Sequence, residues 1–156
     1  MPVVKDKEKI ARLLFYPMMV KNGVLTPAAF PMDELLAQKD KNGSSVDRYD
    51  LLNGPENLLY QKARKNANPN AGRNPFGFGL AYVRDVRSLK INSGSDQALE
   101  IYPDALQDKQ HPDPWDHAHA LVRKYCDTYK RGRLRGVRDY LIELFSENIH
   151  EFNNPH

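Results

Sequence analysis

One segment of the chain, residues 136–148, carries a clear helical pattern, and this pattern limits the fold more than any other feature. Its apolar residues recur at spacings of three and four, namely Val137, Tyr140, Leu141, Leu144 and Phe145. Such spacing gives a helix one apolar face, which must pack against another element. The remaining apolar runs are short and are separated by turn-forming residues, which favours strands. The sequence therefore predicts an α+β fold, in which a small mixed or antiparallel sheet carries short helices and a C-terminal amphipathic helix.

Five short runs are expected to form the strands, namely residues 13–16, 45–49, 79–83, 98–102 and 115–122. A second amphipathic helix is predicted over residues 55–66, and one helical turn over residues 85–89. Residues 66–79 are rich in Asn, Gly and Pro, which is typical of a long loop. The Gly-x-Gly at the end of this loop precedes a strand, whereas phosphate-binding glycine motifs follow a strand and open a helix. We therefore interpret it as a flexible entry to the strand.

The length of 156 residues suits a single domain with its own core. We expect residues 1–9 to be a flexible lead-in, residues 10–149 to form the α+β domain, and residues 150–156 to be a flexible tail. The single cysteine, Cys126, excludes an internal disulfide and a cysteine-based zinc site. The charged N-terminus lacks the apolar run of a signal peptide, and no run reaches the roughly 20 apolar residues of a membrane span. These features predict a cytoplasmic protein without membrane contact.

The charge is unevenly distributed, although the formal net charge is only +3. Residues 123–139 contain seven cations against two acids, and residues 95–116 contain six acids against one lysine. Cations interleaved with tyrosines suit phosphate contact and base stacking in single-stranded nucleic acids. The candidate nucleic-acid-binding residues are Lys130, Arg131, Arg133 and Arg135. Two other interpretations stay open, because a charge run can form a solvated face or be neutralised by the acidic segment.

Two of the five histidines, His117 and His119, lie beside the only tryptophan, within residues 113–122. On an extended strand their side chains would point to the same face. Such a pair can pack in the core, transfer protons or bind a metal. No HExxH pattern and no third histidine at ligand spacing accompany the pair, so we assign no metal ligand. We take His119 and His117 as candidate catalytic residues.

The second candidate site is Ser45-Val46-Asp47-Arg48, which follows directly after a polar, glycine-containing loop. Arg48 could hold a phosphate or carboxylate through its planar fork, and Ser45 could add a hydroxyl. Asp47 is a candidate catalytic carboxylate. A turn followed by an ion pair is the structural alternative. A Ser-His-Asp triad can be drawn from Ser45, either histidine and an acid, although no nucleophile-elbow pattern surrounds the serine.

Several motifs occur in a fixed order: residues 12–15, 25–30, 45–48, 79–83 with 86–89, and 119–122. This order resembles small bacterial proteins of unassigned function that carry a central Ser-Val-x-Arg and a late His-Ala. The resemblance spans residues 12–122, carries no activity with it, and implies a greater role for Arg48 and His119 than for His117. The order of an arginine, a serine and a later polar residue also resembles ADP-ribosyltransferase-like folds, which bind NAD in a split β-sheet. The glutamate motif of these folds is absent, because the residues around Glu100 and Glu143 do not match the sequence expected around that glutamate.

These observations lead to three functional hypotheses. The first is a bacterial cytosolic accessory or interaction module, with a protein or polyanion as partner and an anion-binding pocket around Arg48 and His119. The second is a small hydrolase or transferase for a phosphate-bearing or nucleotide substrate. In this enzyme Arg48 would hold the phosphate and His119 or His117 would act as general base. Asp47 or Asp116 would orient that histidine. The third is a nucleic-acid-binding protein that uses residues 123–138.

Overall fold

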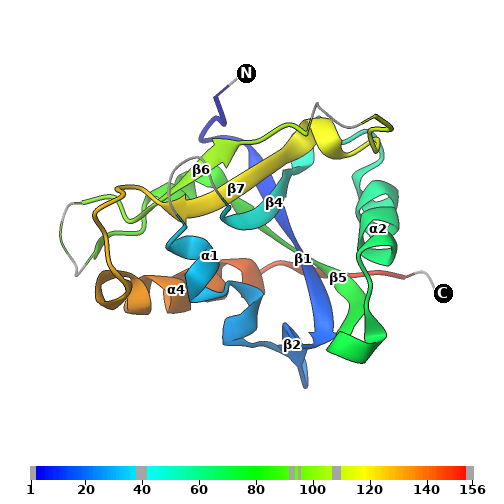
Figure 1. Ribbon diagram of the computed structural model, residues 1–156, viewed down its shortest axis with the longest axis horizontal. Coiled ribbons are helices and arrows are strands. Elements are labelled where there is room, and N and C mark those ends of the chain that lie inside the picture. The colour runs from blue at the N-terminus through cyan, green and yellow to red at the C-terminus, as the bar shows by residue number, and fades with distance from the viewer. Residues whose placement is uncertain (1–2, 38–41, 92–93, 95, 107–109, 154–156) are drawn as a thin grey trace.

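A six-stranded sheet forms the centre of the computed structural model, which describes residues 3–37, 42–91, 94, 96–106 and 110–153 (Figure 1). Its strand order is β6-β7-β4-β1-β5-β8, and every neighbouring pair is antiparallel. The six strands are β1 (Lys9–Pro17), β4 (Ser44–Arg48), β5 (Arg73–Tyr82), β6 (Leu99–Pro103), β7 (His119–Lys124) and β8 (Ile149–Glu151). A separate two-stranded hairpin consists of β2 (Val20–Lys21) and β3 (Val24–Leu25). The predicted α+β class is confirmed, with an antiparallel rather than a mixed sheet.

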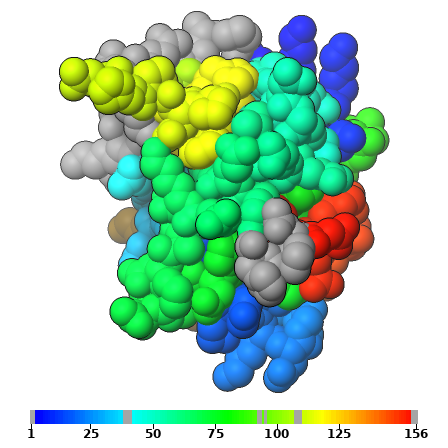
Figure 2. Space-filling model, turned by 90° about the vertical axis from the view of Figure 1, so that its right-hand side faces the viewer, coloured from blue at the N-terminus to red at the C-terminus, as the bar shows by residue number. Residues whose placement is uncertain are grey.

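Helices cover both faces of this sheet. The α-helices are α1 (Met32–Leu35), α2 (Pro55–Lys65), α3 (Val83–Arg87) and α4 (Arg131–Ser146). Single 3₁₀ turns are η1 (Pro27–Ala29), η2 (Tyr49–Leu51), η3 (Pro69–Ala71) and η5 (Asp116–Ala118). In Figure 1, α1 and α4 lie on one side of β1 and β5, and α2 lies on the other side. Figure 2 faces α2 and shows it between the yellow segment around residues 110–118 and the red C-terminal segment.

Strand β1 lies inside the sheet and is buried on both faces. Residues 10–15 are all buried, and Ile10 and Leu14 have no exposed surface. A strand with helices on both sides loses the polar and apolar alternation of a half-exposed strand. This explains why the segment reads as a continuous apolar run in the sequence. The helix α4 buries Val137, Leu141 and Phe145 of the predicted apolar face, together with Leu134. Leu144 is half-buried, and Tyr140 is exposed, so its assignment to the buried face is wrong.

Strand β5 begins at Arg73, so half of the predicted loop 66–79 is in fact strand. It pairs with β1 from Lys9 to Pro17. Its glycines allow close packing: a Cβ at Gly77 would collide with the carbonyl oxygen of His150 in β8. A Cβ at Gly79 would lie 2.8 Å from the carbonyl oxygen of Phe145 in α4. The Gly-x-Gly therefore belongs to a packed strand and not to a flexible entry.

The expected strand 115–122 is wrong over its first four residues. Residues Asp116–Ala118 form the turn η5, and β7 begins at His119. The turn is held by the amide of Ala118, which donates to the carbonyl of Trp115 at 3.0 Å. The carboxylate of Asp116 accepts the backbone N–H of Asp113 at 2.8 Å. His117 and His119 therefore do not share one face of a strand.

The packed structure extends beyond residues 10–149 at both ends. Val4 is fully buried, and Glu8 contacts Arg48 in β4. Strand β8 includes the first two residues of the segment expected to be a tail. Among the described residues, no helix has the length and the apolar character needed to cross a membrane.

Candidate active site

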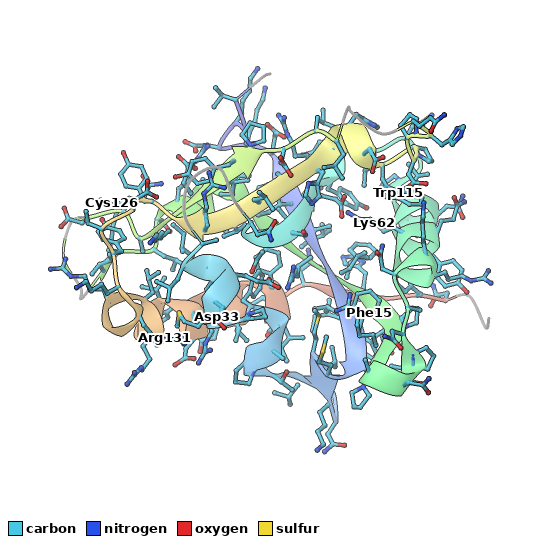
Figure 3. The ribbon with its side chains drawn as sticks, viewed as in Figure 1. Phe15, Asp33, Lys62, Trp115, Cys126 and Arg131 are labelled. Atoms are coloured by element: carbon cyan, nitrogen blue, oxygen red, sulfur yellow. The ribbon has the colours of Figure 1, made fainter. Side chains whose placement is uncertain are left out.

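A cavity of about 330 Å³ lies beside α2, over β1, β4 and β7. Its apolar lining consists of Leu13, Phe15, Met19, Leu106 and Trp115. Its polar lining includes Ser45 and His119, together with a group of charged side chains from six parts of the chain. Figure 3 shows Phe15 on β1, Trp115 above it, and Lys62 on α2 at the height between them. A volume of this size accommodates a small organic ligand.

The cavity reaches a gap in the sheet. Strands β1 and β4 pair only at Ile10 with Arg48 and at Ala11 with Asp47, and then they separate. The side chain of Arg12 fills the gap, where Nη1 donates to the carbonyl of Ser45 at 2.8 Å. Burial lowers the pKa of Arg12, although the nearby Glu34 carboxylate raises it. Arg12 therefore fixes the backbone at Ser45 with a guanidinium that is almost completely buried.

Ser45, His119 and Asp104 form a continuous chain of hydrogen bonds at the edge of this cavity. The Oγ atom of Ser45 lies 3.1 Å from Nε2 of His119. The opposite ring nitrogen, Nδ1, lies 2.9 Å from Oδ2 of Asp104 and 3.1 Å from the Asp104 carbonyl oxygen. A carbonyl oxygen only accepts, so Nδ1 carries the proton in the neutral ring. Nε2 is then the acceptor, and the Ser45 hydroxyl donates to it.

The register of three strands brings these residues together. Asp47 in β4 is opposite His119 in β7, so Ser45, two residues earlier on the same face, is the diagonal neighbour of His119. Pro103 in β6 is opposite Ala120. The pairing continues for one more residue, because the amide of Asp104 donates to the carbonyl of His119 at 2.9 Å. The sheet thus holds both neighbours of the His119 ring.

Burial differs along the hydrogen-bond chain in a way that suits a reactive serine. Ser45 is exposed, whereas the His119 side chain is only 10% exposed. The Asp104 side chain is 43% exposed. The hydroxyl is therefore accessible to a ligand, while the imidazole between the two partners is held in place.

The helix α2 carries two lysines that face the cavity through ion pairs. Nζ of Lys62 lies 2.7 Å and 3.0 Å from the two carboxylate oxygens of Asp47. Nζ of Lys65 contacts both carboxylate oxygens of Asp113 at 2.8 Å and 2.7 Å. Asp47, predicted as a catalytic carboxylate, is thus bound to Lys62, and the acid bound to His119 is Asp104.

Arg48, the predicted anion-binding residue, contacts a different part of the molecule. Its Nε and Nη2 donate to Oε1 and Oε2 of Glu8, each at 2.9 Å. Both residues are more than nine-tenths buried. Burial alone would raise the pKa of Glu8, but the hydrogen bonds from Arg48 and from the Lys5 backbone lower it below its ordinary value of 4.5. Arg48 does not line the cavity, so the structure separates it from Ser45 and His119.

His117 also lies outside the cavity lining. Its Nε2 is 2.9 Å from the carbonyl oxygen of Leu51, and the residue is exposed. This contact connects η5 to η2 across the surface. Of the two candidate histidines, only His119 reaches the serine.

The basic segment 123–138 is divided between the core and the surface. Arg123 and Lys124 are buried in β7, where the Arg123 guanidinium lies 3.9 Å from the centre of the Tyr102 ring. Four residues lie at the start of α4 or just before it, namely Lys130, Arg131, Arg133 and Arg135. Arg131 pairs with Asp33 of α1, as Figure 3 shows. Cys126 lies at the far end of the molecule from Lys62 (Figure 3).

The candidate residues Ser45 and His119 do lie together, whereas the sequence offered no reason to expect Lys62 or Arg12 beside them, or to choose Asp104 among the nearby acids as the partner of His119. Among the described residues, no group of three or more His, Cys, Asp or Glu side chains is placed to hold a metal ion. Comparison with known proteins finds no matching family model, no similar curated protein and no similar solved structure. The function of the protein is therefore inferred from the geometry of the cavity.

Proposed function

We propose that the protein is a small serine hydrolase in which Ser45 is the nucleophile, His119 the general base and Asp104 the residue that orients His119. The observation that carries this proposal is the hydrogen-bond chain from Ser45 Oγ to the Asp104 carboxylate. The 3.1 Å between Ser45 Oγ and His119 Nε2 lies within the reach needed for proton transfer. The same constellation of roles occurs on unrelated folds, so it is recognised by geometry and not by sequence position.

The reaction begins when Ser45 Oγ attacks the carbonyl carbon of an ester and His119 Nε2 takes the hydroxyl proton. The tetrahedral intermediate collapses as the alcohol oxygen leaves, and His119 gives that oxygen the proton. An acyl group then remains on Ser45. A water molecule attacks this acyl group while His119 takes a proton from it, and the proton returns to Ser45 as the acid leaves.

Asp104 supports both proton transfers through Nδ1 of His119. Its carboxylate stabilises the imidazolium that forms when Nε2 accepts the proton. Its carbonyl oxygen holds the same N–H and thereby fixes the tautomer before the reaction starts. Asp104 is therefore a positioning residue, since it acts through His119.

Lys62 is the candidate for stabilising the negative charge of the tetrahedral intermediate. Its ammonium lies over Asp47, two residues from Ser45 on the same face of β4. Asp47 accepts two of the three N–H donors of this ammonium, and the third can bind the substrate oxygen. Asp47 would then hold the Lys62 ammonium in place and partly neutralise its positive charge.

The other functions expected from the sequence have weaker geometric support. An anion-binding module built on Arg48 and His119 requires both side chains in one pocket, and Arg48 is bound to Glu8 elsewhere. A nucleic-acid surface over residues 123–138 would lack Arg123 and Lys124, which are buried. The hydrolase proposal uses side chains that already contact one another.

The direct test is covalent labelling of the 156-residue chain with a fluorophosphonate, whose fluoride leaves as an activated serine attacks phosphorus. We expect mass spectrometry to place the label on Ser45, and Ser45→Ala and His119→Ala to abolish it. Ser88→Ala is the matched control, because Ser88 is exposed and lies outside the cavity lining. A wild-type protein that resists labelling, or a label that persists in Ser45→Ala, would refute the proposal.

A further inference from the structure

The cavity lining contains four cations and four carboxylates, but not every cation is in an ion pair with one of these carboxylates. Its charged lining consists of Arg12, Lys62, Lys65, Arg73, Glu34, Asp47, Asp113 and Asp116. Three of the four cations have an ion-pair partner in this group. Lys62 binds Asp47, Lys65 binds Asp113, and Arg12 reaches Glu34 at 3.4 Å.

Arg73 is the fourth cation, and its side chain is held in a different way. Its guanidinium carbon lies 4.2 Å from the centre of the Phe15 ring. Its Nε makes one long contact, 3.5 Å, to the carbonyl oxygen of Asn66. Among the described residues, no carboxylate lies within ion-pair distance of Arg73. A guanidinium that rests on an aromatic face keeps its N–H edges for a planar, bidentate ligand.

Arg12 is a second cation of the cavity lining that lies close enough to interact with Arg73. Its guanidinium is desolvated, and the positive charge of Arg73 is close enough to lower the pKa of Arg12, after the larger effect of burial. Glu34, which contacts Arg12 at 3.4 Å and is 39% exposed, raises the pKa of Arg12 by more than Arg73 lowers it. A bound anion would relieve the repulsion between the two guanidinium groups.

We propose that Arg73 binds the anionic end, a carboxylate or a phosphate, of the ester that Ser45 cleaves. This inference rests on the proposed hydrolase function and names its substrate class. Phe15, whose ring the Arg73 guanidinium covers, and Leu13 are apolar lining residues of the same cavity as Ser45. The substrate is therefore a small ester with an apolar centre and one anionic group.

The kinetic test compares two esters with the same leaving group, 4-nitrophenyl acetate and mono-(4-nitrophenyl) succinate. We expect the wild type to prefer the succinate ester, and Arg73→Gln to reduce the ratio of the two kcat/KM values about 10- to 100-fold, which is typical of a lost charge-assisted hydrogen bond. Arg73→Lys should retain part of the preference, because the charge remains while the fork is lost. Arg64→Gln is the matched control, because Arg64 also lies over an aromatic ring but outside the cavity lining.

A binding test keeps the inference separate from the hydrolase proposal. Succinate and inorganic phosphate are titrated into the wild type, Arg73→Gln and Arg64→Gln, with calorimetric detection, and the tighter anion identifies the preferred group. Anion binding that requires Arg73, without any ester hydrolysis, would refute the hydrolase function and leave the anion site standing. Hydrolysis at Ser45 without a preference for succinate, and anion binding unchanged by Arg73→Gln, would overturn the inference alone. If neither ester hydrolysis nor anion binding is observed, both the hydrolase proposal and the inference about Arg73 are overturned.

Discussion

The strand β4 presents two polar arrangements on its opposite faces, and they have opposite characters. On one face, Arg48 and Glu8 form a bidentate ion pair that is almost completely buried. On the other face, the exposed Ser45 donates to His119 at the edge of a cavity. The first arrangement satisfies its charges internally and leaves none for a ligand. The second arrangement ends in a hydroxyl that a ligand can reach.

This difference separates a structural use of charge from a chemical one. A buried ion pair is weak evidence of stability gain, but it becomes costly when one partner is removed. A hydrogen-bonded serine, in contrast, can be changed with little effect on the fold. Variants on the two faces of β4 should therefore divide between loss of stability and loss of activity.

The largest expected effect is on the structural face. Glu8→Ala leaves the Arg48 guanidinium buried without its main carboxylate partner, so we expect a loss of about 3–5 kcal/mol of unfolding free energy. Urea denaturation measures the change. Ser45→Ala is the comparison, and its stability should stay within about 0.5 kcal/mol of wild type. If the two variants lose stability equally, the distinction between the two faces is wrong.

The second effect is on activity and concerns Asp104. Asp104→Asn should reduce kcat about 100-fold, a smaller loss than the roughly 10⁴-fold that removal of a triad carboxylate charge can cause. The reduction is smaller because the Asp104 carbonyl still holds Nδ1 of His119 and its tautomer. KM should change little, since Asp104 does not line the cavity. Ester turnover and fluorophosphonate labelling rates both measure the effect.

The control for this prediction is Asp139→Asn, which makes the same substitution at an exposed position of α4. It should leave both rates unchanged. A variant Asp104→Asn with wild-type kcat would show that the carboxylate has no role in the reaction. A loss of stability that parallels the loss of rate would instead make Asp104 a structural residue.

The third prediction concerns the pH dependence of stability. The pKa of Glu8 is lower in the folded protein than its ordinary value of 4.5, so folding favours the ionised carboxylate. The associated stability is present above about pH 4.5 and is lost as the pH falls through the lower, folded-state pKa. Glu8→Gln should therefore be less stable than wild type at neutral pH, and the gap should narrow in acid. Thermal denaturation from pH 7 to pH 3 tests this, and a constant gap would contradict it.

The regular parts of the fold were predictable because their signals are local. The helical spacing in α4 and the apolar run of β1 both follow from side-chain patterns within one element. The predicted strand 79–83 covers only the end of β5, and residues 73–78 were assigned to a loop, because the glycines of this strand are required by contacts with β8 and α4, which lie about 70 residues further along the chain. The early start of α4 at Arg131 was hidden by Gly132 and Gly136, which are weak helix formers.

The site was predictable only where a residue type is itself unusual. Ser45 and His119 attracted attention by their chemistry, and Arg48 did so equally, although it contacts Glu8. Asp104 was one of six acids in a polar stretch, and only the register of β6 and β7 places it beside His119. A single sequence shows which polar side chains are present. Whether a given side chain forms an internal ion pair or part of a reactive site depends on how the strands pair.

The smallest expected effect concerns the ion pair between Arg131 and Asp33, which contrasts with the buried pair of Glu8 and Arg48. The side chains of Arg131 and Asp33 are 53% and 88% exposed, so water and salt screen their attraction. We expect Arg131→Ala to change the unfolding free energy by less than about 1 kcal/mol. If the start of α4 also binds nucleic acid, the variant should lower the salt dependence of oligonucleotide binding by about one unit of slope. Urea denaturation measures the change in unfolding free energy, and a salt titration with a single-stranded oligonucleotide measures the change in slope. A stability loss as large as that of Glu8→Ala would show that exposure does not distinguish the two ion pairs.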